Sequence, residues 1–232
     1  MVRVICLLIG YALGLIQTGY IIGRIKGVDI RQHGSKNAGT TNMLRTLGLK
    51  YAGMVLLGDV LKCGIAILIV NFMYKDIYPD MLPLLKVYAA TGTILGHNYP
   101  FYLKFKGGKG IAATAGLVIF GFGPLMTILG IITFFGIFFI THYVSLGSIF
   151  VYVGIIIEGF ILSKSGYFGQ GIATTYFVEF NALLWFLAIL TWWRHRVNIV
   201  NLIKGTERKT YLKGKPEIDV NEKKENKEGK NG

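Results

Sequence analysis

Charged residues are scarce in this chain of 232 residues, since only 16% are Asp, Glu, Lys or Arg, whereas soluble domains contain about 25%. Cysteine is nearly absent: Cys6 and Cys63 both lie in apolar runs, which excludes a disulfide framework and a cysteine metal cluster. Low charge beside 53% hydrophobic residues excludes an intrinsically disordered protein and disfavours a water-soluble domain. The composition therefore predicts an integral membrane protein.

Acidic residues are scarcer than basic ones, with 12 Asp and Glu against 25 Lys and Arg and a net charge of +13. In a polar protein such an excess indicates nucleic-acid binding, but here it is concentrated in links between apolar runs and in the tail. Segments 24–50, 104–109 and 194–232 hold 20 of the 25 basic residues. Because loops rich in Lys and Arg stay in the cytoplasm, we place these three segments on that side and expect no nucleic-acid partner.

The apolar residues form stretches long enough to cross a bilayer, because a helix of about 20 residues spans the ~30 Å hydrocarbon core. A cleavable signal peptide is the alternative for the first stretch, but Arg24 follows it directly, without a small-residue exit. We therefore expect a retained first helix. The apolar stretches are at about 4–23, 51–74, 82–103, 110–162 and 173–193.

The number of crossings follows from the side assigned to the basic segments. With all three inside, the 110–162 stretch must cross an odd number of times, and its length favours three crossings, broken at 121–124 and near 142–145. The predicted fold class is an all-α integral membrane protein with seven transmembrane helices, an outside N-terminus and a cytoplasmic C-terminus. Residues 1–208 form one domain, and 209–232, without apolar periodicity, form a basic, disordered tail.

A first polar cluster lies between the first two apolar stretches. It combines glycines with small hydroxyl and amide side chains and an arginine, which together offer the backbone N–H groups, hydroxyls and guanidinium that bind phosphate. Thr40 or Thr41 would cap a short helix carrying Arg45. A flexible connection is the alternative interpretation. The candidate residues are Ser35, Asn37, Gly39, Thr40, Thr41, Asn42 and Arg45.

A second cluster, Lys104 to Gly110, opens the fourth predicted helix with three glycines and three lysines. Glycines let a backbone approach a phosphate closely, and a helix N-terminus follows. The loop is not a Walker A motif, because Gly110 and not Ser or Thr follows Lys109. We take Lys104, Gly107, Gly108 and Lys109 as candidates for binding a second phosphate.

A third cluster follows the last apolar stretch and contains Asn198 and Glu207. Glu207 either pairs with a basic neighbour or acts as a base. Asp59 and Lys62 share one face of the second predicted helix, where ionisable residues pair or line a polar cavity. The remaining candidates are polar side chains at helix ends, each of which also has a structural interpretation as a hydrogen-bonding anchor: His97, Asn98 and Ser145.

Several familiar catalytic signatures are missing. The sequence contains no HExxH motif, no Cys/His cluster and no GxSxG motif. None of the four histidines is followed five residues later by the aspartate of the common glycerolipid acyltransferases. We therefore expect neither a metal nor another cofactor.

Taken together, the polar segments resemble the motifs of the acyl-phosphate:glycerol-3-phosphate acyltransferase (PlsY) family of bacterial membranes. The similarity extends over about residues 5–208. The chain departs from the usual pattern at Leu15, Gln17 and Asn201, where the family usually has Ser, Pro and Arg. The segments that carry the resemblance are 34–42 with Arg45, 96–98 with 105–110, and His195-Arg196 with Asn198, Gly205 and Glu207, beside 59–62 and 143–146.

The resemblance implies transfer of a fatty acyl group from acyl phosphate to the 1-hydroxyl of glycerol 3-phosphate, giving lysophosphatidic acid for phospholipid biosynthesis. It implies seven transmembrane helices and a bacterial cytoplasmic membrane, with the active site facing the cytoplasm or the inner leaflet. Because acyl phosphate is already activated, no covalent acyl-enzyme is needed. We expect the first cluster, with Asn198, to hold acyl phosphate and the second to hold glycerol 3-phosphate, with Lys104 near both. Either His97 orients the substrate hydroxyl or the substrate's own phosphate accepts its proton.

Two other functions remain open at this point. A transporter or flippase of a phosphorylated metabolite would also need anion-binding helix ends, but it would need polar groups on both faces. The predicted outer links 75–81 and 163–172 are poor in them. A non-catalytic binder of anionic lipids is the third reading. We expect the protein to be a monomer embedded in the lipid bilayer.

Overall fold

The structure, a computed structural model, describes residues 1–212, 214 and 216–218, which form helices and loops without strands. The helices are α1 (Val2–Gly14), α2 (Thr18–Ile25), α3 (Thr40–Leu47), α4 (Leu49–Tyr74), α5 (Leu82–Asn98), α6 (Ile111–Leu117), α7 (Pro124–Thr141), α8 (Val144–Lys164), α9 (Gln170–Ala173), α10 (Phe177–Arg194) and α11 (Arg196–Ile203). Short turns are η1 (Ile30–Gln32), η2 (Pro79–Met81), η3 (Phe101–Leu103) and the π-helical η4 (Val118–Phe122).

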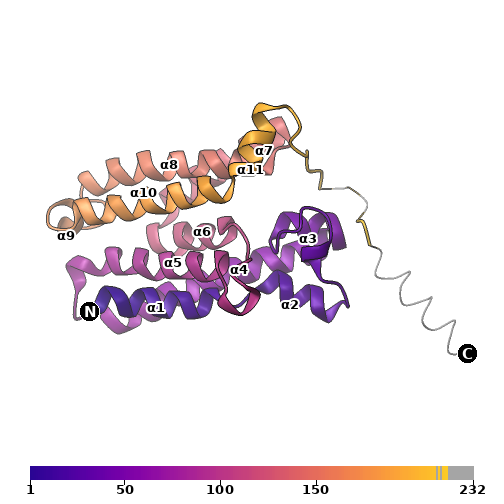
Figure 1. The fold of residues 1–232 in the computed structure, drawn as a ribbon. Helices are drawn as coiled ribbons and strands as arrows, with labels where there is room; N and C mark the ends of the chain where they lie inside the picture. Colours follow the sequence, from indigo (N-terminus) through magenta and orange to yellow (C-terminus); the bar gives the residue numbers. More distant parts are fainter. Residues whose placement is uncertain (213, 215, 219–232) are drawn as a thin grey trace, which may run out of the picture.

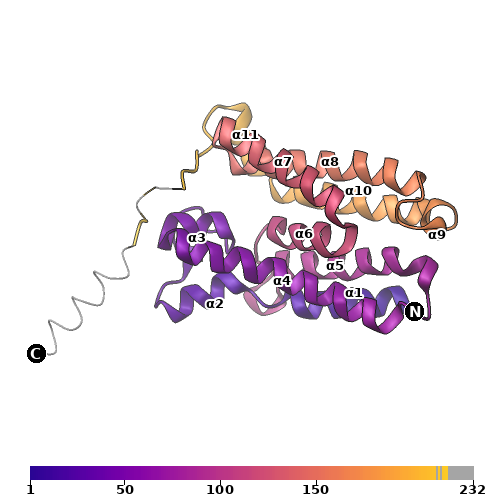
Figure 2. The ribbon, with the colours of Figure 1, turned by 180° about the vertical axis from the view of Figure 1, so that it is seen from behind.

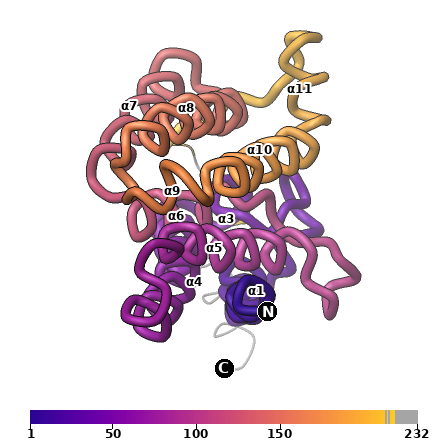
Figure 3. Tube along the Cα trace, turned by 90° about the vertical axis from the view of Figure 1, so that its left-hand side faces the viewer, coloured from indigo at the N-terminus to yellow at the C-terminus, as the bar shows by residue number. Residues whose placement is uncertain are grey.

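The long helices run alongside one another in two layers (Figure 1). Helices α1, α4 and α5 make one layer and α7, α8 and α10 the other, with α6 packed on α4 and α5 between them. Figures 1 and 2 show the short helices α2, α3 and α11 at one end, whereas α9 and the N-terminus lie at the other. Figure 3 shows the two layers along the helices. An apolar core cluster takes residues from both layers, including α5, α6, α8 and α10. The three polar clusters thus come to the same end.

Each apolar stretch of the sequence is helical in the structure, as one helix or as several. Val2–Ile25, Leu49–Tyr74, Pro124–Thr141 and Val144–Lys164 are long and apolar enough to cross a membrane. The other three predicted crossings correspond to α5, α6 with η4, and α10, which are shorter or more polar. The 110–162 stretch breaks between η4 and Pro124 and again between α7 and α8, as predicted. The all-helical fold is confirmed, and the count of seven crossings stays a prediction.

The first predicted helix is not continuous, because Leu15 to Gln17 separate α1 from α2. The break frees backbone carbonyls, which are bound by one side chain from another helix and by one within the break. The Lys62 ammonium donates to the Ile16 carbonyl over 2.8 Å. The buried Gln17 amide donates to the carbonyls of Gly14, Gly96 and His97 over 3.1 to 3.3 Å. These four carbonyls thereby have hydrogen-bond partners, as a membrane interior requires.

Helices α1 and α5 pack backbone to backbone through glycines. A Cβ atom at Gly10 would lie 1.8 Å from the Ala89 carbonyl oxygen, and one at Gly92 would lie 2.0 Å from that of Leu7. Small residues four apart allow this approach between membrane helices. The sequence signal is a pair of Gly-x-x-x-Gly motifs, and the glycines are Gly10, Gly14, Gly92 and Gly96.

Candidate functional site

The three polar clusters meet in one pocket at the end of the molecule that carries α3 and α11. Its volume is about 860 Å³. Basic residues outnumber acidic ones around it, which suits a ligand with several negative charges. The basic lining residues are Arg31, Lys36, Arg45, Lys106, Lys109, Arg194 and Arg208, and the acidic ones are Asp29 and Glu207. The remaining lining residues are Gln32, Gly34, Ser35, Asn37, Phe105, Gly107, Val197, Asn198, Asn201 and Thr206.

The first cluster is organised by Asn42, which is 1% exposed and does not line the pocket. Its Oδ1 accepts hydrogen bonds from the Ser35 backbone N–H over 2.7 Å and from the Ser35 hydroxyl over 3.1 Å. Its Nδ2 donates to the carbonyls of Ile30 and His33 over 2.7 and 3.2 Å. The amide therefore closes the loop and presents Ser35 to the pocket. Asn42 thus has a positioning role in the structure, and its contact with substrate stays a prediction.

The predicted short helix exists as α3, but its cap differs from the prediction. Gly39 occupies the N-cap position, so neither Thr40 nor Thr41 caps the helix, and neither threonine lines the pocket. The Thr40 hydroxyl is buried and has no hydrogen-bond partner among the described residues. Arg45 lies in the last turn of α3 and does reach the pocket. Burial above all lowers the pKa of its guanidinium, with the Arg208 cation acting in the same direction.

The second cluster rests on the C-terminal end of α5. A Cβ atom at Gly107 would lie 2.0 Å from the His97 carbonyl oxygen, and one at Gly108 would lie 2.0 Å from its imidazole Nε2. The loop needs glycines because its backbone packs directly on His97. His97 is 3% exposed and does not line the pocket. Gly108 packs against its imidazole ring. The glycine loop packs on the His97 ring, and the contact of His97 with the substrate hydroxyl stays a prediction.

His97 belongs instead to a buried polar network with Asp59 and Lys62. The Lys62 ammonium lies 2.8 Å from the Asp59 carboxylate and 2.8 Å from His97 Nδ1. The Thr18 hydroxyl donates to the same carboxylate over 3.0 Å. These contacts join α2, α4 and α5 beneath the glycine loop. The ion pair predicted from sequence is present, and it supports the site from below.

Lys109 projects from the glycine loop and joins the second cluster to the third. Its ammonium donates to Asn198 Oδ1, and Asn198 Nδ2 donates to Glu207 Oε1 over 2.7 Å. The Ser145 hydroxyl donates to the same carboxylate oxygen over 2.7 Å. Burial above all lowers the pKa of Lys109 to about 8, with the Arg194 and Arg45 cations acting in the same direction and Glu207 opposing them. Glu207 thus accepts hydrogen bonds from two neutral side chains, and the ion pairs among the described residues do not include it, so the expected pairing with a basic neighbour is replaced by an orienting role.

Arg194 was missed by the sequence reasoning, although it is the first basic residue after the last apolar stretch. It lines the pocket, and its Nη2 donates to the carbonyls of Gly107 and Gly108 over 3.1 and 2.7 Å. Its guanidinium also lies 5.2 Å from the centre of the Tyr99 ring. Arg194 therefore fixes the glycine loop from the pocket side, opposite His97.

The predicted candidates divide into those that line the pocket and those that support it. Lys104 is exposed and Asn98 is fully buried, and neither lines the pocket, so their contacts with substrate stay predictions. Gly39, Gly108 and Ser145 are also not among the lining residues. Among the described residues, no group of three or more His, Cys, Asp or Glu is arranged to hold a metal ion. The predicted residues that do line it are Ser35, Asn37, Arg45, Gly107, Lys109, Asn198 and Glu207.

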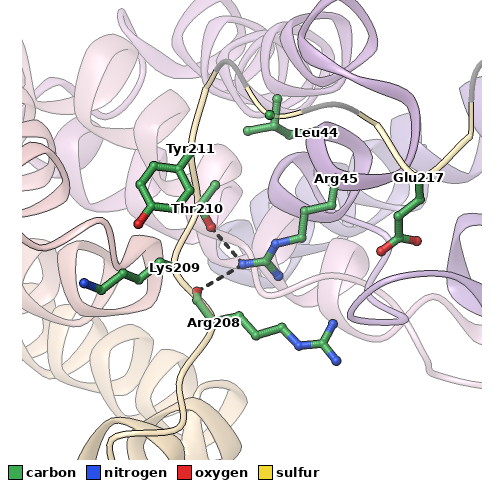
Figure 4. Close-up of a pocket in the computed structure, with 8 residues that line it drawn as sticks. Leu44, Arg45, Arg208, Lys209, Thr210, Tyr211 and Glu217 are labelled. Atoms are coloured by element: carbon green, nitrogen blue, oxygen red, sulfur yellow. Dashed lines mark hydrogen bonds between the residues drawn. The ribbon is translucent and has the colours of Figure 1, made fainter.

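A second, smaller pocket adjoins the first and shares Arg45 and Arg208 with it. Its volume is about 460 Å³. Figure 4 shows the Arg45 side chain extending from α3 toward the chain segment that follows α11, where dashed lines join it to Arg208 and Thr210. The lining is completed by Leu44, Lys209, Thr210, Tyr211, Gly214 and Glu217. The C-terminal segment thus forms one wall beside Arg45.

Comparison with known proteins finds relatives that all have the same description. The family model described as glycerol-3-phosphate acyltransferase matches residues 4–205. The glycerol-3-phosphate acyltransferase of Bacillus subtilis is 35% identical over 210 residues, covering 90% of this chain and 98% of that protein. That of Halalkalibacterium halodurans is 42% identical over 200 residues, covering 86% and 91%.

Solved structures agree with the sequence relatives. The chain is similar to PlsY, described as an integral membrane glycerol 3-phosphate acyltransferase, in its glycerol 3-phosphate form. The TM-score is 0.76 and the sequence identity 32%, with 90% of this chain and 96% of that chain covered. For the lysophosphatidic acid form the TM-score is 0.74 and the identity 31%, with the same coverage.

Proposed function

The chain belongs to the glycerol-3-phosphate acyltransferase family of integral membrane enzymes, and from that membership we propose how its basic pocket works. The enzyme transfers a fatty acyl group from acyl phosphate to the 1-hydroxyl of glycerol 3-phosphate, giving lysophosphatidic acid and phosphate. The observation that carries the proposal is the meeting of all three polar clusters around one cation-rich pocket. Both substrates bear a phosphate, and such a pocket neutralises both.

Each phosphate is assigned to the cations on one side of the pocket. Ser35 and Arg45, from the first cluster, hold acyl phosphate. Lys109 and the backbone of Gly107 hold the phosphate of glycerol 3-phosphate, with Asn198 orienting the lysine. The support for this division is geometric, because the Lys109–Asn198 pair and the α3 arginine come from different elements that line the same space.

The chemical step needs no enzyme nucleophile. The 1-hydroxyl oxygen of glycerol 3-phosphate attacks the acyl carbonyl carbon, and a new ester C–O bond forms as the C–O bond to phosphate breaks. The phosphate leaves with the bonding electron pair and takes the hydroxyl proton. The enzyme contributes by positioning the hydroxyl and stabilising the anionic charge that develops. The burial of His97 and the two hydrogen bonds that Glu207 already accepts favour the substrate's own phosphate as the proton acceptor.

The membrane arrangement belongs to the same proposal. Seven helices cross a bacterial cytoplasmic membrane, with the pocket at the cytoplasmic face and the N-terminus outside. The basic segments at the pocket end support this orientation. At the opposite end Glu179 binds Arg3 over 2.5 Å and accepts a hydrogen bond from Tyr88 over 2.6 Å, so these polar groups pair with one another. That pairing disfavours the alternative, a transporter or flippase with ligand groups on both faces. The enzyme acts as a monomer.

The deciding experiment is acyl transfer by the purified protein supplied with acyl phosphate and glycerol 3-phosphate. We expect lysophosphatidic acid from the native chain and at least a hundredfold lower kcat/KM from Arg45→Ala, since one donor to developing charge contributes roughly that factor. Arg24→Ala is the matched control, because Arg24 is exposed on α2 and does not line the pocket. Near-normal turnover by a folded Arg45→Ala protein contradicts the assignment. Transport of glycerol 3-phosphate without acyl transfer favours the rival.

A further inference from the structure

The chain beyond α11 crosses the pocket end of the molecule and attaches to α3. We call residues Arg208 to Ile218 the C-terminal strap, of which 213 and 215 lie outside the described residues. The strap lies beyond residue 205, where the match to the family ends. The disordered tail predicted from residue 209 therefore begins with a segment that makes specific contacts, and 219–232 lie outside the described residues.

One end of the strap is attached to the turn between α7 and α8. The Thr210 backbone N–H donates to the His142 carbonyl over 2.9 Å. The rings of His142 and Tyr211 lie 4.8 Å apart, and the Lys209 ammonium lies 5.8 Å from the centre of the Tyr143 ring. These contacts fix the backbone on both sides of Thr210.

The other end of the strap is attached to α3. The backbone N–H groups of Glu217 and Ile218 donate to the carbonyls of Arg45 and Thr46 over 2.8 and 3.0 Å. Those carbonyls lie in the last turn of the helix, where carbonyls lack intrahelical partners. Ile218 also packs on the apolar cluster that includes Met43. The strap therefore connects α3 to the α7–α8 turn.

At its first attachment the strap also binds the Arg45 side chain. Arg45 Nη2 donates to the Thr210 hydroxyl over 2.8 Å and to the Arg208 carbonyl over 3.3 Å, as Figure 4 shows. Thr210 is 3% exposed, so its hydroxyl is held inside the contact. Both bonds leave from one nitrogen, and they leave Nε and Nη1 for a second ligand.

We propose that Thr210 is a positioning residue, which holds the Arg45 guanidinium in the pocket in the geometry that receives the substrate's phosphate. The proposal rests on the proposed function of Arg45. Fixing a long, flexible side chain before the substrate binds removes an entropic cost from binding and from the transition state.

The chemistry of the contact distinguishes positioning from blocking. Both acceptors are neutral, one a hydroxyl and one a carbonyl, so the guanidinium keeps its full charge for an anion. A segment that blocked the site would place a carboxylate on the arginine. Glu217 lines the same small pocket, but the ion pairs among the described residues do not join it to Arg45.

The test replaces Thr210 in the full chain by valine, which keeps the shape and removes the hydroxyl. We expect kcat/KM for acyl phosphate to fall by roughly tenfold, the effect of one hydrogen bond to a charged group. Thr210→Ser should restore most of the rate, which a purely structural role of the threonine methyl group would not produce. In an Arg45→Ala background Thr210→Val should cause little further loss, because the two residues act together.

Truncations give a second, independent measurement. A chain ending at Ile218 keeps the strap and should have the native rate, whereas one ending at Glu207 should lose activity at least as much as Thr210→Val. Folding of the Thr210→Val variant is judged by its thermal unfolding. If this variant does not fold, the two truncations test the role of the strap.

The outcomes also separate this inference from the proposed function. An unchanged rate in folded Thr210→Val overturns the positioning role, and a faster rate shows that the strap blocks the site. If Arg45→Ala is inactive while Thr210→Val is normal, only the strap inference fails. If Arg45→Ala is fully active, the proposed function of Arg45 fails first.

Discussion

At the scale of single residues, the charge of Lys109 depends on pH close to neutrality. Burial lowers the pKa of its ammonium to about 8. Above that pH the folded free enzyme loses the cation assigned to the phosphate of glycerol 3-phosphate. A phosphate monoester has its second pKa near 6, so the substrate is already dianionic there. The loss of affinity for glycerol 3-phosphate at high pH therefore comes from deprotonation of Lys109 and not from a change in the substrate's charge.

We expect kcat/KM for glycerol 3-phosphate to fall as pH rises through about 8. The fall in kcat should come at a higher pH, because the bound phosphate favours the charged lysine and raises its pKa. Lys109→Arg, whose side chain does not lose its proton, should remove the fall from the profile, at whatever rate it retains. A pH profile that is the same in the native and arginine enzymes would assign the titration to another group.

Residue type alone predicted part of this site. Ser35, Arg45 and Lys109 were predictable because phosphate needs hydroxyl donors and cations near flexible backbone. The loop-closing role of Asn42 was not, and His97 was left open between a substrate contact and a hydrogen-bonding anchor, because the same polar side chain either faces a pocket or supports a loop from behind. Which of the two occurs depends on tertiary contacts, such as the packing of Gly108 on His97, that no local pattern encodes.

At the scale of helices, the contact between α1 and α5 places the site, because α5 carries the end on which the glycine loop rests. Gly92→Ala should destabilise the fold strongly, since its Cβ atom would lie 2.0 Å from the Leu7 carbonyl oxygen of α1. The helices must separate to accept it, at a cost of about 1–3 kcal/mol or more for overpacking. Thermal unfolding in detergent measures the change.

Gly53→Ala is the matched control for that substitution. Gly53 lies on α4, and no atom lies within 4 Å of its added Cβ. Its unfolding midpoint should stay the same or rise, because alanine is the better helix former. Equal midpoints for Gly92→Ala and Gly53→Ala would show that the two helices do not pack as closely as described.

Element positions followed from the sequence more fully than element contacts did. The apolar stretches and the break at Pro124 marked the helices, because hydrocarbon length and proline chemistry are local properties. The division between α1 and α2 was not predicted, since the Ile16 carbonyl at that break is bound by Lys62 from α4. The partner that makes the break tolerable lies 46 residues away in sequence.

At the scale of the whole molecule, the seven-crossing arrangement makes a prediction about sides of the membrane. The native Cys6 and Cys63 are buried, so they provide a low background for labelling engineered cysteines. Asp76, in the link after α4, and Lys164, at the end of α8, are exposed and are predicted to be outside. Lys50, at the start of α4, is exposed and is predicted to be cytoplasmic, on the same side as the pocket.

We expect a membrane-impermeant thiol reagent to label Asp76→Cys and Lys164→Cys in intact cells, and Lys50→Cys only after the membrane is opened. The reason is that the Lys- and Arg-rich segments are held inside, which places the two links after α4 and α8 outside. Labelling of Lys164→Cys from inside would mean that residues 110–162 cross an even number of times, so that α6 with η4 does not count as a crossing. That helix is short, and its buried residues pack on α4 and α5 within the protein. The side of the membrane on which Lys164→Cys is labelled thus decides whether α6 with η4 spans the bilayer.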